Sequence, residues 1–138
     1  MHTVHGTIRL SVEGRILTIE GQGPWNLESI DLSVDSIGDD LRALYGAPWG
    51  ALVLVEGDSI LVPDAEARLI EVVRDDRVKG RLATALVLGE CSVPGLVTQH
   101  LQEVYTAAGD VFQAFSNADD ARRWLNAQIK AAGQTHLQ

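Results

Sequence analysis

The sequence predicts an α/β domain in which a mostly parallel mixed sheet follows an antiparallel hairpin. Residues 51–55 and 82–88 are almost continuously apolar, which is typical of strands buried on both faces of a parallel sheet. Helical patterns, with apolar residues three or four apart, separate these strands from each other and from a last strand at 111–115. Strands joined through helices require right-handed crossovers. The expected order is therefore ββαβαβαβα, with the helices packed on the sheet.

The first two strands are expected to form the hairpin. Residues 7–12 alternate polar and apolar side chains, Glu13-Gly14 makes a turn, and residues 15–20 resume with β-branched side chains. Gly21-Gln22-Gly23-Pro24 then ends the strand pattern.

A first helix is predicted after this break. Asn26 is its natural N-cap, Gly46-Ala47-Pro48 stops it, and Gly38 is a weak point inside it. Its buried face is expected to hold Leu27, Ile30, Val34, Ile37, Leu41 and Leu44.

The buried strand at 51–55 leads through residues 56–62 into a second helix. Pro63 fits the first turn of that helix, and acidic side chains near it suit the positive end of the helix dipole. The acidic residues are Asp64 and Glu66, and the basic residues at the other end are Arg74 and Arg77. The turn carries acids but no nucleophile–base pair, so the junction has no catalytic signature.

Two more helices complete the pattern. Ser92 is expected to cap the third, where Pro94 fits the first turn and Gly109 terminates the helix. Ser116 or Asn117 caps the closing helix. The inward residues are Leu96, Val97, Leu101, Val104 and Tyr105 in the third helix, and Ala121, Trp124, Leu125 and Ile129 in the last. Residues 1–138 are expected to form a single domain with its core at about 7–129, and residues 132–138 to fray as a short mobile tail.

Composition and charge exclude several classes of protein. Of 138 residues, 46% are apolar and 22% are charged, which is ordinary globular usage. The net charge of −8 repels a phosphate backbone, so no nucleic-acid partner is expected. No apolar run approaches the roughly 20 residues that span a bilayer, and no export signal is visible. A cytoplasmic protein without a transmembrane segment is the expectation.

Two short motifs carry a resemblance to a known family. The first opens the first long helix and reads Gly23-Pro24-Trp25-Asn26. The second is the strand Val111-Phe112-Gln113-Ala114-Phe115 followed by the segment from Ala118 to Leu125, which reads Ala-Asp-Asp-Ala-Arg-Arg-Trp-Leu. With the element order, these motifs make residues 7–129 resemble the STAS domains of sulfate transporters and anti-sigma-factor antagonists. The resemblance is closest to stand-alone bacterial STAS proteins that are also likened to the Sec14 (CRAL-TRIO) lipid-binding fold. It implies a non-enzymatic binding module without a cofactor, whose partner is a small amphipathic or anionic, lipid-like ligand or a regulatory protein.

The chain departs from these antagonists at their phosphorylation site. They carry Asp-Ser-Ser-Gly at the start of the helix after the central strand, where this chain has Asp64-Ala65-Glu66-Ala67. The phosphoacceptor hydroxyl is missing, and Ser59, five residues before Asp64, is a poor substitute. Glu66 could supply a permanent charge in place of a phosphoserine. We therefore expect no serine phosphorylation switch.

The alternative hypothesis is a small thiol-dependent enzyme. Cys91 is the only cysteine, which excludes an internal disulfide and a cysteine-based zinc site. It follows a predicted strand and lies at the start of a helix, a position that can lower the pKa of a thiol. The enzyme would use Cys91 together with Glu90 or His100. A buried, unreactive cysteine is the simpler interpretation.

The remaining candidates also have simple structural interpretations. Trp25 and Trp49 flank the first helix, where they would close the core or line a ligand pocket or partner surface. The histidines His2, His5, His100 and His136 do not predict a metal site. The paired acids are interpreted as solvated faces and helix caps, and they are Asp39-Asp40, Asp75-Asp76 and Asp119-Asp120. A weak homodimer could form through the edge strand of the hairpin, although Arg9 and Arg15 favour a shielded edge. The candidate ligand- or partner-binding residues are Trp25, Trp49, Asp58, Ser59, Asp64, Glu66, Glu90 and Cys91.

Overall fold

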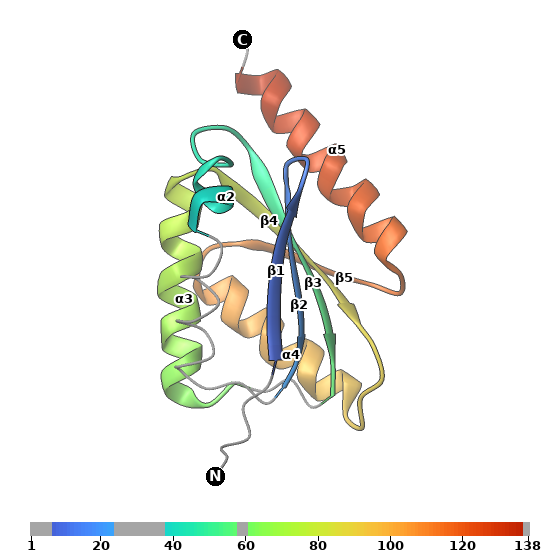
Figure 1. Cartoon of the computed structure of the whole chain (residues 1–138). Coiled ribbons are helices and arrows are strands. Elements are labelled where there is room, and N and C mark those ends of the chain that lie inside the picture. Colours follow the sequence, from blue (N-terminus) through green and yellow to red (C-terminus); the bar gives the residue numbers. More distant parts are fainter. Residues whose placement is uncertain (1–6, 24–37, 58–60, 137–138) are drawn as a thin grey trace.

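The computed structural model describes residues 7–23, 38–57 and 61–136. They form one five-stranded sheet in the order β1-β2-β3-β4-β5, in which β1 and β2 are antiparallel and the other neighbours are parallel (Figure 1). The predicted fold class is thus confirmed. The elements are β1 (Thr7–Glu13), β2 (Ile16–Gln22), α2 (Gly38–Arg42), β3 (Trp49–Glu56), α3 (Pro63–Val78), β4 (Arg81–Leu88), α4 (Pro94–Ala107), β5 (Val111–Phe115) and α5 (Ala118–His136).

The helices form two layers, one on each face of the sheet. Helices α3 and α4 lie on one face and α5 crosses the other (Figure 1). The first layer encloses a core that includes Val53, Leu86 and Leu101, and α5 inserts Ala121 and Leu125 against the opposite face. Right-handed crossovers between strands added in sequence order put α3 and α4 on the same face, whereas α5 follows the last strand and is free to cover the other face.

A smaller apolar cluster joins the hairpin to the short helix α2. Leu41 and Leu44 pack there with Leu17 and Trp49, as the helical spacing of the two leucines predicted. Helix α2 ends at Arg42, so the first helix stops before the predicted Gly46-Ala47-Pro48. The predicted part before Gly38, with its cap Asn26 and with Trp25, lies outside the described residues.

The tight turn of the hairpin is tied to the loop after α2. Gly14 has a φ of 62°. Two-residue turns between antiparallel strands need a positive φ at this position, and glycine adopts it without steric cost. The guanidinium of the next residue, Arg15, donates hydrogen bonds to the carbonyl oxygens of Pro48 at 3.0 Å and Ala47 at 2.9 Å, and also to that of Leu44. Arg15 therefore holds the loop in place and does not shield the sheet edge as expected.

The helix ends confirm some predictions and correct others. Pro63 and Pro94 start α3 and α4, and Asn117 caps α5 through a 2.8 Å hydrogen bond from the backbone N–H of Asp120 to its side-chain oxygen. The cap of α4 is Val93, so the prediction of Ser92 was wrong. The pattern also misplaced Leu96, which lies in the first turn of α4 and is 56% exposed.

The last helix is longer than the sequence pattern suggested. Helix α5 continues to His136, so the expected frayed tail from residue 132 is instead helical over most of its length. Its early turns pack on the sheet and its last turns project beyond it (Figure 1). Within the described ranges, no helix is long and apolar enough to cross a membrane.

Candidate functional sites

The carboxyl ends of β3 and β4 are joined by backbone hydrogen bonds. The N–H of Gly57 donates to the carbonyl of Glu90 at 2.8 Å, and the N–H of Gly89 donates to that of Val55 at 2.7 Å. Glu90 and Cys91 therefore leave the sheet beside the turn that leads toward α3. Asp64 is exposed and Glu66 is half-buried in the first turn of α3, whereas Asp58 and Ser59 lie outside the described residues.

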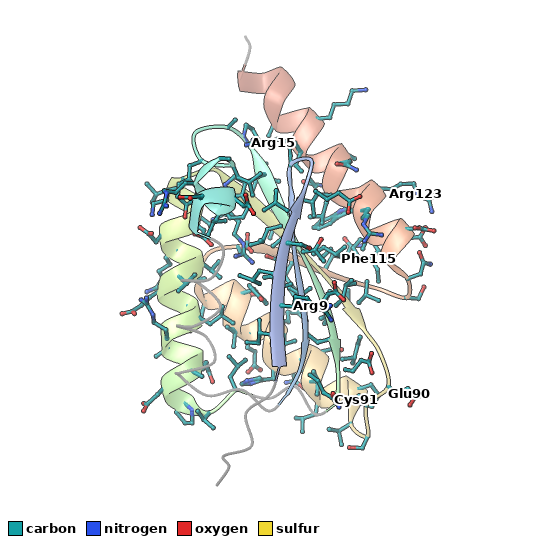
Figure 2. The ribbon with its side chains drawn as sticks, in the orientation of Figure 1. Arg9, Arg15, Glu90, Cys91, Phe115 and Arg123 are labelled. Atoms are coloured by element: carbon teal, nitrogen blue, oxygen red, sulfur yellow. The ribbon has the colours of Figure 1, made fainter. Side chains whose placement is uncertain are left out.

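Cys91 is partly buried and packs against the core under α4. Its proposed helper His100 is engaged elsewhere, because its Nε2 accepts a hydrogen bond from the backbone N–H of Leu61 at 3.4 Å. Figure 2 shows Glu90 and Cys91 on the loop that follows β4. His100 is therefore not in the position of a general base for Cys91.

A row of neighbouring side chains crosses the sheet face that carries α5. In the strand register, Arg9 lies beside Glu20, Glu20 beside Leu54, and Leu54 beside Val87. Phe115 of β5 continues the row and contacts the Trp124 ring of α5, with 5.5 Å between the ring centroids. Arg9 and Phe115 mark the two ends of this row in Figure 2.

The carboxyl-end half of this face holds an open depression, which we call the sheet-face groove. Its volume is about 440 Å³. Leu54 and Val87 contribute apolar surface, and Arg9, Glu20 and Glu56 contribute charges. The lining residues are Ile8, Arg9, Glu20, Gly21, Gln22, Leu54, Val55, Glu56, Val87 and Gly89.

Of the candidate residues that the structure describes, which are Trp49, Asp64, Glu66, Glu90 and Cys91, none lines this groove. A signal was present in the hairpin, where the charged residues Arg9 and Glu20 are cross-strand neighbours on one face and indicate that this part of the face is open to solvent. Which strands stand beside that face depends on the sheet order, so the sequence pattern did not place Leu54 and Val87 next to it.

A second cluster, the buried ion network, lies at the amino ends of the parallel strands. Arg81 at the start of β4 donates hydrogen bonds to Asp76 Oδ2 at 3.3 Å and to Thr84 Oγ1 at 2.8 Å. The hydroxyl of Thr84 donates in turn to Asp110, whose other oxygen accepts a 2.7 Å hydrogen bond from Arg77. The side chains of Arg81, Asp76 and Asp110 are only 2%, 6% and 0% exposed.

Burial governs the electrostatics of this network. It raises the pKa of Asp76 above the ordinary aspartate range, and the Arg81 guanidinium opposes that rise only in part. Burial likewise raises the pKa of Tyr105, whose ring lies 5.6 Å from the Arg81 guanidinium carbon. Nε of Arg81 lies 3.6 Å from Asp110 Oδ2 and is the buried polar atom that lacks a hydrogen bond among the described side chains.

The network ties the ends of α3 and α4 to the starts of β4 and β5. Its contacts hold these elements in register. The network reaches the surface where Arg77 is 32% exposed, and Asp76 is part of the lining of a depression beside α3. Sequence reasoning missed it, although Thr84 was a signal: a polar residue inside a strand buried on both faces needs a partner.

Trp49 belongs to the core beside this network. It is 0% exposed, and its indole N–H donates a 3.2 Å hydrogen bond to the carbonyl of Lys79. Of the two roles expected for Trp49, the structure places it in core closure. No group of three potential metal-ligating side chains occurs among the described residues.

Comparison with protein-family models, with curated proteins and with solved structures found no match to this chain.

Proposed function

We propose that the chain is a non-catalytic, STAS-like binding module that docks a segment of a regulatory protein in the sheet-face groove. The observation that carries this proposal is the groove itself, an open surface with aliphatic side chains and charges from four strands. A rigid sheet supports it from below. Surfaces that combine apolar contacts with a charged rim are common in protein interfaces.

A protein segment fits this groove better than a lipid-like ligand does. Ligand pockets usually bury 70–90% of a small molecule, whereas this depression is open and has charged residues among its lining. Among the lining residues that the structure describes, the carboxylates of Glu20 and Glu56 stand against one cation, Arg9, and the chain carries a net charge of −8. These charges attract a basic segment and disfavour an anion.

The STAS resemblance supports a regulatory role on the same scaffold. The antiparallel hairpin followed by parallel strands is the arrangement that the resemblance implied. Asp64 is exposed at the start of α3, where the antagonists carry their phosphorylation site, and Ala65 beside it is fully buried and has no hydroxyl. Binding is therefore proposed to be constant and not controlled by a phosphate at this helix.

The proposal can be tested by placing a photo-crosslinking side chain in the groove. Gln22 is exposed at the groove, and Gln102 is exposed on α4 at the opposite face of the sheet. A benzophenone residue at position 22 should crosslink one defined protein in a lysate of the source cells, and mass spectrometry should map the adduct to a basic segment. The same residue at position 102 is the matched control. Equal crosslinking from both positions would exclude the groove as the docking surface.

A charge reversal gives a second readout once that protein is purified. Glu20→Lys should weaken its binding about tenfold or more, because a rim attraction becomes a repulsion. Glu103→Lys on the exposed side of α4 should leave binding unchanged. Native mass spectrometry of the freshly purified chain tests the ligand-carrier alternative, since retained lipid or organic acid would favour a carrier.

The thiol-enzyme alternative makes an opposite prediction about Cys91. A partly buried thiol packed against the core should react with iodoacetamide at least about tenfold more slowly than it does in the denatured chain. Rapid, selective alkylation of the folded protein at neutral pH would revive the enzyme hypothesis.

A further inference from the structure

Strand β1 forms one edge of the sheet, and its outer side pairs with no other strand in the described part of the chain (Figure 1). The closing pair of the hairpin is Glu13 with Ile16, across a two-residue turn. Residues that close such a turn exchange their backbone hydrogen bonds, and this pattern alternates along the strand. Glu13, Ser11 and Arg9 therefore bond inward to β2, and the backbone groups of Ile8, Leu10 and Val12 point to the open edge.

The exposed charged side chains of β1 are complementary to those of a second, antiparallel copy of β1. Arg9 and Glu13 are both exposed, carry opposite charges and lie four residues apart on one face of the strand. If a second β1 pairs antiparallel with Ser11 on the two-fold axis, Arg9 of each copy lies opposite Glu13 of the other. Leu10 then lies opposite Val12, and these are the residues whose backbone groups point outward.

Other registers lack this match. Shifting the axis to Arg9 sets two like charges opposite each other, and shifting it to Leu10 sets Arg9 against Ser11. The opposite edge strand, β5, reads Val-Phe-Gln-Ala-Phe and has no charge to select a register. Arg15, which could have blocked the β1 edge, is bound to loop carbonyls instead.

We propose that β1 is a self-association edge, through which two copies of this chain pair antiparallel about Ser11 and continue one sheet across the dimer. Two Arg9–Glu13 pairs, related by the two-fold axis, fix the register. Such symmetric, isologous pairing is the commonest route to a homodimer. The inference is independent of the binding function proposed for the groove. Because one strand pair buries little area, the association is expected to be weak.

A charge-swap series tests this register by sedimentation equilibrium from about 10 μM to about 1 mM protein. The wild-type chain should show a monomer–dimer equilibrium. Arg9→Glu and Glu13→Arg should each weaken dimerisation roughly tenfold or more, because each replaces two attractions by two repulsions. The double variant Arg9→Glu/Glu13→Arg should restore it. Circular dichroism of each variant checks that the fold is retained.

A cysteine scan in a Cys91→Ala background tests the same geometry without relying on charge. Ser11→Cys should form a disulfide-linked dimer rapidly under mild oxidation, because the two thiols face each other at the axis. Arg9→Cys should form it slowly, since four residues of strand, about 13 Å, would separate its thiols.

Three results would overturn the inference. The first is a wild-type chain that is monomeric across the whole concentration range. The second is a dimerisation affinity that the charge reversals leave unchanged, and the third is a double variant that does not regain the wild-type affinity. A dimer crosslinked best through Arg9→Cys would show that the copies pair in another register.

Discussion

Replacing Arg81 by methionine tests whether the buried ion network holds the amino ends of the strands together. Methionine keeps an unbranched apolar stem but removes the guanidinium, so the change is the loss of the buried charge, of its hydrogen bonds and of its contacts with the rings of Trp49 and Tyr105. Asp76 would lose the buried cation that donates a hydrogen bond to it, whereas Asp110 would keep Arg77 and Thr84.

The size of the effect follows from this difference. Breaking a buried ion pair by removing one partner costs about 3–5 kcal/mol. Because only one of the two carboxylates is stranded, we expect Arg81→Met to lower the free energy of unfolding by about 3 kcal/mol. With a slope of about 1.5–2 kcal/mol/M, the urea midpoint should fall by about 1.5–2 M.

The measurement is urea unfolding at pH 7, followed by circular dichroism and tryptophan fluorescence. Adding Asp76→Asn to Arg81→Met removes the stranded charge and should recover about 1–2 kcal/mol. Arg123→Met is the matched control, because Arg123 forms an exposed ion pair with Asp120 and should contribute less than about 0.5 kcal/mol. A loss for Arg81→Met below about 1 kcal/mol, or equal to that of the control, would refute a stabilising role for the network.

Two further predictions concern the pH dependence of stability and the backbone. Because burial raises the pKa of Asp76, the native state binds its proton more tightly than the unfolded state, so its contribution to stability rises as the pH falls through the folded pKa and levels off below about 4. Urea unfolding at several pH values should therefore show wild type gaining stability relative to Asp76→Asn as the pH falls, and a constant difference would contradict the raised pKa. Gly80→Ala should cost at least about 2 kcal/mol, because Gly80 has a φ of 116° and a new Cβ would lie 2.4 Å from the Ala47 carbonyl oxygen. Thermal unfolding measures this, and a wild-type melting temperature would show that the loop adjusts without strain.

The local patterns that predicted the fold are those with an immediate physical cause. Proline at the first turns of α3 and α4, glycine in the hairpin turn and asparagine before α5 act through nearby backbone, so the sequence revealed them. The continuous apolar run in β4 also predicted that this strand is buried on both faces, because each face of a central parallel strand is covered. Predictions failed at Leu96, where exposure depends on how far the sheet extends beneath the first turn of α4.

The candidate sites depended on distances between strands, which a single sequence does not contain. Glu90 and Cys91 follow the carboxyl end of β4, as expected. His100, however, accepts a hydrogen bond from the backbone of Leu61 and is not paired with Cys91. The groove joins Arg9, Glu20 and Leu54 from three strands, and the network joins Asp76, Arg81 and Asp110 from two helix ends and a strand.

The sequence by itself determined the order of strands and helices, the parallel sheet after a hairpin, and the acidic character of the surface. Hydrophobic periodicity and local capping encode these features within a few residues. Only the tertiary structure decided which charges are buried and which line an open face. Burial and ion pairing depend on elements that lie far apart in the chain, and Arg9, Arg15 and Arg81 have three different environments that their residue type does not distinguish.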